Sequence, residues 1–544
     1  MTTSMTALVG KRAVADYSRR PLNLVLLVVV PVALVFVWGP SLADLSTLFG
    51  GSGDRGQIEA ATAGWAAAAL AGLAGFFQVA GSRATDRRLA AADGRCAMVV
   101  AGRLGASLCL ALLAATGGLM ALAVRTGITD PFRAVAATVL IAITYVALGV
   151  LVGTIVKTEM NGALLVTLAW VFDVFLGPAM SSGPSLMTRV FPLHFPTLLL
   201  TGQATGHAGP VGDLGWSFIW AVGLSILAVV RLAVTTRPAA APSALRVESV
   251  IGPVPEMTGF APSAPTSFPS DLQAPVRSKA IIRTTTTTRP TPVQAPPIAV
   301  LRAGMREHRR NRVLWALLVV VPAVFIGMAI MVTLDMPGPI AVVDGGRHFT
   351  AFLSERRIHA ATMVPVTSAF LAGLTGLFVI TGSAGGDRRL VLAGLRPRDV
   401  FAGRLGVVAA ATVLTTAVAV AISSVWYPPR QWVVFALANL LIALTYAMLG
   451  VLLGPLTGRM GGLYLMLLLA FVDVGLGQNV MLAAGPPSWG AFLPARGASR
   501  VMIDGAFTAH FDQLWYLLLG VAWLVGLTAV TGEVFRRRTA TARR

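Results

Sequence analysis

Charged residues are scarce in this sequence. Asp, Glu, Lys and Arg make up 12% of its 544 residues, against about 25% in a typical soluble domain. Hydrophobic residues make up 56%, and the mean hydropathy is +0.76. A chain of this composition cannot keep most of its surface in water. The composition therefore excludes an ordinary soluble protein and predicts an all-α polytopic membrane protein.

The sequence also lacks the short motifs by which many enzymes bind phosphates or metals. It contains no G-x-x-x-x-G-K-[ST] phosphate-binding loop, no Cys-x-x-Cys pair and no H-E-x-x-H, and its six histidines are scattered. We therefore expect no catalytic residue, no metal site and no cofactor on this chain. Only two cysteines are present, Cys96 and Cys109, and we interpret both as free thiols.

Acidic residues are outnumbered by basic ones, and the net charge is +20. The basic residues do not form one face that could bind nucleic acid. They stand in short clusters at the ends of apolar runs, the pattern that sets membrane topology and here places both termini in the cytoplasm. Lysine is nearly absent while Arg, Ala and Gly are abundant, which indicates a GC-rich bacterial genome and the bacterial cytoplasmic membrane.

Long apolar runs predict about twelve transmembrane helices, since a span needs about 20 mostly apolar residues. Six belong to a first domain, residues 1–236, and six to a second, residues 301–544. The Pro-, Thr- and Ala-rich segment 237–300 is predicted to be a disordered cytoplasmic linker. Because six is even, the halves should be parallel and related by a pseudo-two-fold axis along the membrane normal. The predicted spans are 21–39, 60–81, 100–124, 134–156, 161–180, 213–235, 313–334, 360–382, 401–425, 431–455, 461–483 and 513–531.

Short blocks of sequence occur once in each half. Asp86-Arg87-Arg88 recurs as Asp387-Arg388-Arg389, at an offset of 301 residues, in the predicted cytoplasmic loops between spans 2 and 3. Anchoring on the inner side of the membrane explains the arginines. An aspartate at the same place twice can also cap a short helix or offer mixed charge to a cytoplasmic partner. Both interpretations are open at this point.

Basic segments precede the first span of each half. Residues 9–20 include Arg19 and Arg20, and residues 301–312 include Arg309 and Arg310. Apolar residues are interspersed among the basic ones, which favours a short amphipathic helix in the membrane interface. Membrane anchoring alone would explain the charge, and contact with a cytoplasmic partner is the more specific hypothesis.

Asp173 and Asp473 fall within the fifth predicted span of their halves. A carboxylate at membrane depth is costly and by default points to function, so the pair could face a substrate pathway and attract cationic or polar groups. The alternative is a carboxylate hydrogen-bonded at a helix interface or near the outer end of its helix. Aromatic residues of spans 2 and 5 are further pathway candidates: Phe76, Phe77, Trp170, Phe370, Phe378 and Phe471.

The segment after span 5 is too apolar for a solvated loop. In the first half it contains Phe191, Pro192 and Pro196. We expect a re-entrant helical hairpin broken by its prolines, because irregular backbone at membrane depth must be shielded by protein. The second half carries a weaker version, from Trp489 to Pro494.

These features together resemble a known family of membrane proteins. The basic segment before span 1, the Asp-Arg-Arg loops and the Pro-rich outer hairpin make the chain similar to a fused, double-length permease of the ABC-2 type of ABC exporters. The resemblance covers nearly the whole chain except the linker. More narrowly, the chain resembles fused permeases for polyketide antibiotics of the tetronasin type, which are grouped with multidrug efflux. The weak second hairpin departs from that pattern.

The resemblance implies ATP-driven transport. A separate ATP-binding cassette subunit, expected in two copies, would hold ATP and Mg and hydrolyse the ATP, so this chain would not itself be an enzyme. The segments before span 1 and the span 2–3 loops would receive that subunit's motion. A lipophilic small molecule would then leave between spans 1, 2 and 5 through the outer hairpins.

Two other classes of function compete with this interpretation. A proton-coupled exporter of the major facilitator type also has twelve spans in two parallel halves. Its span 2–3 loop carries a G-x-x-x-D-R-x-G-R-like motif, which residues 382–389 superficially resemble, but neither copy has the second glycine after Asp-Arg. A membrane scaffold that transports nothing is the third class, and it would not need the repeated intramembrane aspartates.

Overall fold

The computed structural model describes most of the two predicted domains. The described residues are 7, 10–12, 14–15, 21–51, 54–93, 96–180, 186–202, 209–237, 297–482 and 487–540. Arg19, Arg20 and nearly all of the predicted linker lie outside them. Residues 297–300, predicted as the end of the linker, already belong to helix α11, so the second half begins earlier than residue 301.

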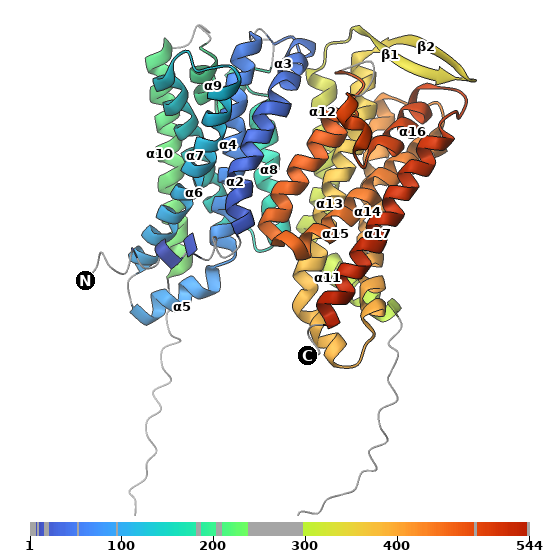
Figure 1. The fold of residues 1–544 in the computed structure, drawn as a ribbon. Coiled ribbons are helices and arrows are strands. Elements are labelled where there is room, and N and C mark those ends of the chain that lie inside the picture. Colours follow the sequence, from blue (N-terminus) through green and yellow to red (C-terminus); the bar gives the residue numbers. More distant parts are fainter. Residues whose placement is uncertain are drawn as a thin grey trace, which may run out of the picture.

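Both halves are built almost entirely from helices (Figure 1). The first half contains α2 (Pro21–Ala33), the π-helical η1 (Leu34–Trp38), α3 (Gly39–Leu48), α4 (Arg55–Ala80), α5 (Arg83–Asp93), α6 (Cys96–Arg125), α7 (Pro131–Ile155), α8 (Glu159–Phe175), η2 (Leu186–Val190), α9 (His194–Thr201) and α10 (Gly209–Thr236). The second half contains α11 (Pro297–Arg310), α12 (Arg312–Val332), β1 (Pro337–Asp344), β2 (Arg347–Ser354), α13 (Glu355–Leu392), α14 (Pro397–Trp426), α15 (Trp432–Leu469), the π-helical η3 (Ala470–Gly477), η4 (Ser488–Phe492), α16 (Arg496–Phe507) and α17 (Leu514–Ala540).

Ten helical segments of the described chain are long and apolar enough to cross a membrane. This confirms a helical polytopic membrane protein but not the predicted count of twelve spans. The predicted spans 431–455 and 461–483 fall on either side of Gly458, whose non-helical backbone (φ 76°) divides the continuous segment Trp432–Gly477 into two helices without a loop. These two predicted spans are therefore counted within one of the ten segments. The predicted span 161–180 corresponds to α8, which has 17 residues and is shorter than the roughly 20 that cross the hydrocarbon core.

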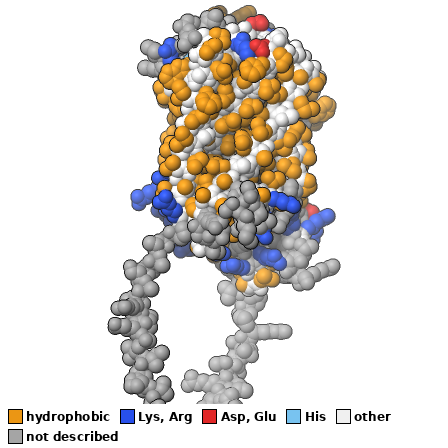
Figure 2. All heavy atoms as spheres, turned by 90° about the vertical axis from the view of Figure 1, so that its left-hand side faces the viewer, with side chains coloured by type: hydrophobic (Ala, Val, Ile, Leu, Met, Phe, Trp, Pro, Cys, Tyr) orange, Lys and Arg blue, Asp and Glu red, His pale blue; other side chains and the backbone are white. Residues whose placement is uncertain are grey.

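The bundle has two distinct ends (Figure 1). At the basic end lie α5, α11 and the C-terminal turns of α10 and α17; at the hairpin end lie β1–β2, α9 and α16. Figure 2 shows hydrophobic side chains over the height of one face and Lys and Arg side chains gathered below them, at the basic end. Only 17% of the apolar window of α10 and 11% of that of α17 is buried in the protein, so their outward faces suit contact with lipid.

Each half has one helix pair in very close contact. In the first half α4 packs on α7, and in the second α13 packs on α15. A Cβ atom on Gly149 would lie 1.9 Å from the carbonyl oxygen of Gly72, and one on Gly450 would lie 1.9 Å from that of Gly373. Small residues of this kind let two helix backbones approach closely inside a membrane. The same contact therefore occurs in both halves, although the pseudo-two-fold relation itself stays a prediction.

The halves differ most at the hairpin end. Only the second half has a β-hairpin among the described residues, with strands joined by Gly345 and Gly346, both at positive φ as a two-residue turn requires. The sequence analysis did not predict these strands. It also expected the weaker outer hairpin in the second half, but α16 has 12 residues against 8 in α9. Because α16 follows Pro494 and lies beyond the segment on which the expectation rested, the weaker second hairpin stays a prediction.

Candidate functional site

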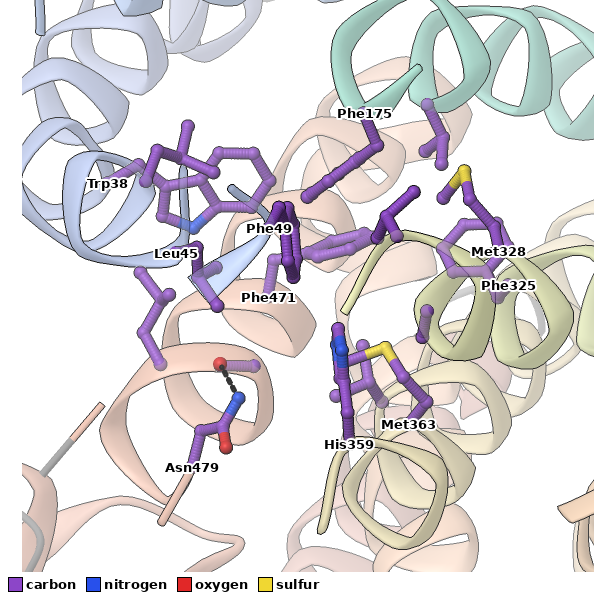
Figure 3. Close-up of a pocket in the computed structure, with 17 residues that line it drawn as sticks. Trp38, Leu45, Phe49, Phe175, Phe325, Met328, His359, Met363, Phe471 and Asn479 are labelled. Carbon is purple, nitrogen blue, oxygen red and sulfur yellow. Dashed lines mark hydrogen bonds between the residues drawn. The ribbon is translucent and has the colours of Figure 1, made fainter. Parts of the chain in front are cut away.

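A small closed cavity lies where the two halves meet, near the hairpin end (Figure 3). Its volume is about 50 Å³. The first half contributes the α2–α3 segment and α8, and the second half contributes α12, α13 and η3. We call it the apolar cavity; its lining includes Trp38, Leu45, Phe49, Phe175, Phe325, Met328, His359, Met363, Phe471 and Asn479.

Aromatic rings in the wall of the apolar cavity join the two halves directly. Trp38 packs edge-on against Phe471, with ring centroids 5.3 Å apart, and Phe49 stacks on His359 at 5.6 Å. Phe325 adds a further ring 6.3 Å from Phe471. Such pairs contribute about 0.5–1.5 kcal/mol each beyond the burial of their area. Apolar packing thus holds this part of the junction closed.

Three polar side chains interrupt the apolar wall: Trp38, His359 and Asn479, whose amide nitrogen donates to the carbonyl oxygen of Gly475 at 3.1 Å. The buried indole N–H of Trp38 has no hydrogen-bond partner among the described residues. His359 Nδ1 lies 2.6 Å from the Thr333 hydroxyl oxygen, which itself lies 2.6 Å from the carbonyl oxygen of Ala329. If the hydroxyl donates its one proton to Ala329, His359 Nδ1 is the donor and Nε2 is left as an acceptor. Besides the amide of Asn479, the lining therefore offers the Trp38 donor and the His359 acceptor, and it contains no Asp, Glu, Lys or Arg.

The size of the apolar cavity indicates which state it represents. Binding pockets for small molecules commonly measure about 300–1,000 Å³, and this space is only about 50 Å³. A drug-sized ligand does not fit unless the halves move apart. In this structure the cavity is therefore too small for a drug-sized ligand.

The predicted pathway aromatics occupy several different environments. Phe471 lines the apolar cavity. Trp170 and Phe370 stand one layer behind it, with Trp170 stacked on Trp38 at 5.7 Å and Phe370 packed on Phe471 at 5.6 Å. These three residues meet at the junction of the halves, as a pathway would require.

The other three aromatics do not meet at the apolar cavity. Phe76 and Phe77 are buried in the hydrophobic core and do not line it, and Phe378 lines a separate cavity at the basic end. Sequence reasoning missed Trp38 and His359. A histidine at the edge of an apolar run is a signal that could have found His359, since ionisable side chains are rare at membrane depth.

Asp173 and Asp473 make matching contacts in the two halves and do not line the apolar cavity. Asp173 accepts hydrogen bonds from the Tyr145 hydroxyl and from the backbone N–H of Leu193, at 3.2 Å for the latter. Asp473 accepts from the Tyr446 hydroxyl at 2.7 Å and from the backbone N–H of Ala495 at 2.9 Å. Leu193 and Ala495 immediately precede α9 and α16.

These contacts favour the structural interpretation of the two aspartates. Both side chains are buried, with 2% and 1% of the residue exposed. Each ties the fifth segment of its half, α8 or η3, to a tyrosine of α7 or α15 and to the start of the short helix at the hairpin end. A buried carboxylate that accepts such bonds is stabilised inside the protein. The prediction that Asp173 and Asp473 face a pathway is therefore not supported.

The Asp-Arg-Arg blocks divide into a buried aspartate and exposed arginines. Asp86 accepts from the guanidinium of Arg103 at 2.9 Å and from Ser82 at 2.5 Å. Asp387 accepts from Arg404 at 2.8 Å and, in the equivalent position, from Ser383 at 2.6 Å. Both aspartates are buried, so they are not available to a partner at the surface. Asp387 also lies inside α13, so it does not cap a helix N-terminus.

The arginines of the same blocks face outward at the basic end. Arg87, Arg88, Arg388 and Arg389 are all exposed. Arg87 also donates to the backbone carbonyl of Thr235 at 3.2 Å, near the end of α10. Arg309 and Arg310 are exposed at the end of α11, the helix that the basic segment before span 1 predicts. A surface of matching arginines thus exists on both halves.

The outer hairpin of the first half is largely buried. Phe191 stacks on Phe172 at 6.4 Å, and Pro192 leads into α9, which contains the buried Pro196. The indole of Trp65 donates to Thr197 at 3.1 Å and fixes α9 against α4. The expected helical segment is present, and the prolines stand at its start.

Within the described residues, no group of three or more His, Cys, Asp or Glu side chains could hold a metal ion. No protein-family model matches the sequence, and a search of curated proteins finds no significant match. The features that indicate a function are therefore the repeat, the membrane-type fold and the geometry of the junction between the halves.

Proposed function

We propose that the chain is the membrane permease of an ATP-driven exporter of lipophilic or amphiphilic compounds, with a separate ATP-binding cassette subunit hydrolysing the ATP. The observation that carries the proposal is the closed apolar cavity between two repeated halves. A path between two similar halves that open in turn is a common design among transporters. The lining is apolar apart from Trp38, His359 and Asn479, which suits a lipophilic molecule.

The basic end supports coupling to a partner outside the membrane. The exposed arginines lie on α5 and on the last turns of α13, and each set is joined to the bundle by a buried ion pair. Asp86 links α5 to α6 through Arg103, and Asp387 links α13 to α14 through Arg404. A force on either arginine surface would therefore move a spanning helix. The sequence has no phosphate-binding loop of its own, so ATP and Mg would be held by the partner.

Orientation follows from the same charges. Basic residues favour the cytoplasmic side of a membrane, and the basic end carries the repeated arginines. We place this end in the cytoplasm, where two copies of the ATPase subunit could reach both halves. The hairpin end then faces outward, and the substrate would leave past α9 and α16.

One observation favours a competing function. Asp173 and Asp473 are buried carboxylates in the membrane-type bundle, and proton-coupled exporters use such groups as proton carriers. The ABC interpretation explains these carboxylates equally well, because their matching hydrogen bonds from backbone N–H groups hold neighbouring helices together. The two functions differ in their energy source, which an experiment can vary directly.

The proposal is tested by expressing the chain together with a candidate ATP-binding cassette subunit. Cells should accumulate less of a lipophilic dye, and mutation of the ATPase's Walker lysine should abolish the effect. Reversing the charge of Arg87, Arg88, Arg388 and Arg389 to Glu should weaken co-purification of the subunit. The matched control is Arg347→Glu, an exposed arginine on β2 at the hairpin end. Unchanged co-purification would show that these arginines do not bind the ATPase subunit. Unchanged dye export with the Walker variant would contradict ATP-driven transport.

A further inference from the structure

A second, larger cavity lies between the halves at the basic end. Its volume is about 950 Å³, within the range of sites that enclose drug-sized ligands. The turn between α7 and α8 forms its first-half wall, and α11, α12, α13, α14 and Arg459 of α15 form its second-half wall. We call it the basic-end cavity; it shares no lining residue with the apolar cavity.

The inner wall of the basic-end cavity is apolar, with its charges paired. Phe378, Val407 and Leu314 contribute buried apolar surface. Of the two arginines in this part of the lining, Arg404 is paired with Asp387 at 2.8 Å and Arg459 with Glu159 at 2.6 Å. These two cations are therefore largely neutralised.

The rim of the same cavity is cationic. Lys157, Arg310 and Arg312 are exposed lining residues, and none of them forms an ion pair with a carboxylate in the described part of the chain. The lining contains two carboxylates: Glu159, which is paired with Arg459, and Glu307. Three free cations thus face one free anion at the mouth of an apolar space. This arrangement complements a molecule with an anionic head and an apolar body.

We propose that the basic-end cavity binds an amphiphile with one anionic head group, a carboxylate or a phosphate. Its apolar part lies against Phe378 and Val407, and its head lies at Lys157, Arg310 and Arg312. Binding at this site does not require transport. That the bound amphiphile is cargo, taken up at the cytoplasmic side before the apolar cavity opens, rests on the proposed export function.

Glycine positions allow the cavity to be filled without disturbing the fold. Gly382 lines the basic-end cavity on α13, and a Cβ atom there meets no atom within 4 Å. Gly385, one turn further along the same helix, is equally open but does not line the cavity. Gly382→Leu should therefore occupy the space, and Gly385→Leu is its matched control. For the charged rim, Lys157→Gln with Arg312→Gln is matched by Arg309→Gln, an exposed arginine outside the lining.

The test uses the purified full-length protein in nanodiscs of phosphatidylcholine, with a photoreactive diazirine analogue of palmitate as the probe. After illumination, mass spectrometry locates the labelled peptides. Labelling should map to α13 and α14 and should be displaced by dodecanoate and dodecyl phosphate, but not by dodecyltrimethylammonium. The Lys157/Arg312 double variant should bind about tenfold more weakly, as expected when two partly screened charge contacts are lost. Gly382→Leu should abolish the labelling, and both controls should retain it.

Two results would overturn the site: labelling that persists in Gly382→Leu, or equal displacement by the cationic amphiphile. Adding phosphatidylglycerol to the nanodiscs distinguishes the source of the head group. Displacement by this lipid at the same peptides supports the site with a membrane lipid as occupant, and continued labelling supports a free amphiphile. Because no ATP or partner subunit is present, missing labelling overturns this site alone. Failed ATP-driven transport with intact labelling overturns only the proposed function.

Discussion

The ion pair between Glu159 and Arg459 gives a sharp prediction about how the halves recognise each other. The two residues stand at equivalent places in the repeat, at the same offset of 300 residues as Asp173 and Asp473. They are paired across the junction, with Arg459 Nη1 2.6 Å from Glu159 Oε2. Two identical halves would oppose Glu to Glu or Arg to Arg at this place. The pair therefore favours association of a first half with a second half.

The magnitude follows from exposure. The side chains are 41% exposed for Arg459 and 22% exposed for Glu159, so solvent screens the pair to about 1 kcal/mol. Reversing one charge replaces attraction by repulsion of similar size, a loss of about 2 kcal/mol, or roughly 30-fold in the dissociation constant of the halves. Reversing both restores the attraction. The bond from Arg459 to the Thr381 carbonyl at 3.3 Å is not restored, so recovery should be large but incomplete.

In the assay the two halves are expressed as one chain and are separated only after purification. A protease site inserted in the linker is cleaved after purification in mild detergent, and dissociation of the two halves is followed on dilution. Glu159→Arg and Arg459→Glu should each loosen the complex, and the double reversal should tighten it again. High salt should reduce these differences. The control is Arg398→Glu, at an exposed arginine whose partner Asp399 lies in the same half. A double reversal no tighter than the single variants would refute the reasoning.

Three other perturbations follow from the structure. Asp173→Asn with Asp473→Asn should lower stability by about 1–3 kcal/mol per site and reduce export of neutral and cationic compounds alike; a loss confined to cations, in dye-efflux assays, would restore the pathway interpretation. Gly450→Ala should lower the thermal midpoint of the purified protein because its Cβ meets backbone at 1.9 Å, whereas Gly327→Ala, with open space, should not; equal midpoints would contradict the close helix contact. Hydrogen bonds from a histidine side chain and from neighbouring backbone N–H groups lower the pKa of Asp344 in the folded protein. The stability that these bonds add is therefore fully present above the pKa of the unfolded chain, about 4. It is lost as the pH falls through the lower pKa of the folded state. Proteolysis at the β1–β2 turn should rise over that acid range and become pH-independent in Asp344→Asn; the same acid dependence in both proteins would contradict this tie.

The sequence predicted the elements that depend on local pattern. Apolar runs placed the long helices, and the repeated Asp-Arg-Arg blocks marked equivalent places in both halves. The apolar, proline-containing segment at Phe191 indicated the short buried helix. Each of these signals lies within about 25 neighbouring residues, where composition and helix length decide the outcome.

Features that depend on how one helix packs on another were not predicted. The partner of Asp86 is Arg103, which follows 17 residues later in the sequence but reaches the carboxylate only through the packing of α5 on α6. The apolar cavity joins Trp38 to Phe471 across most of the chain. That two helices meet at Gly458 without a loop, through a single positive φ, was also not predicted. A hydropathy pattern indicates that a residue is buried, but it does not identify the helix against which that residue packs.

The energy source of transport tests the central proposal most directly. The purified chain and the proposed ATP-binding cassette partner are reconstituted into vesicles with the basic end outward, and uptake of a lipophilic dye is measured with ATP or with a pH gradient. The proposal predicts uptake that requires ATP, the partner and an intact Walker lysine, and that Trp38→Ala weakens without loss of complex assembly. Uptake by this chain alone, driven by the pH gradient, would contradict it.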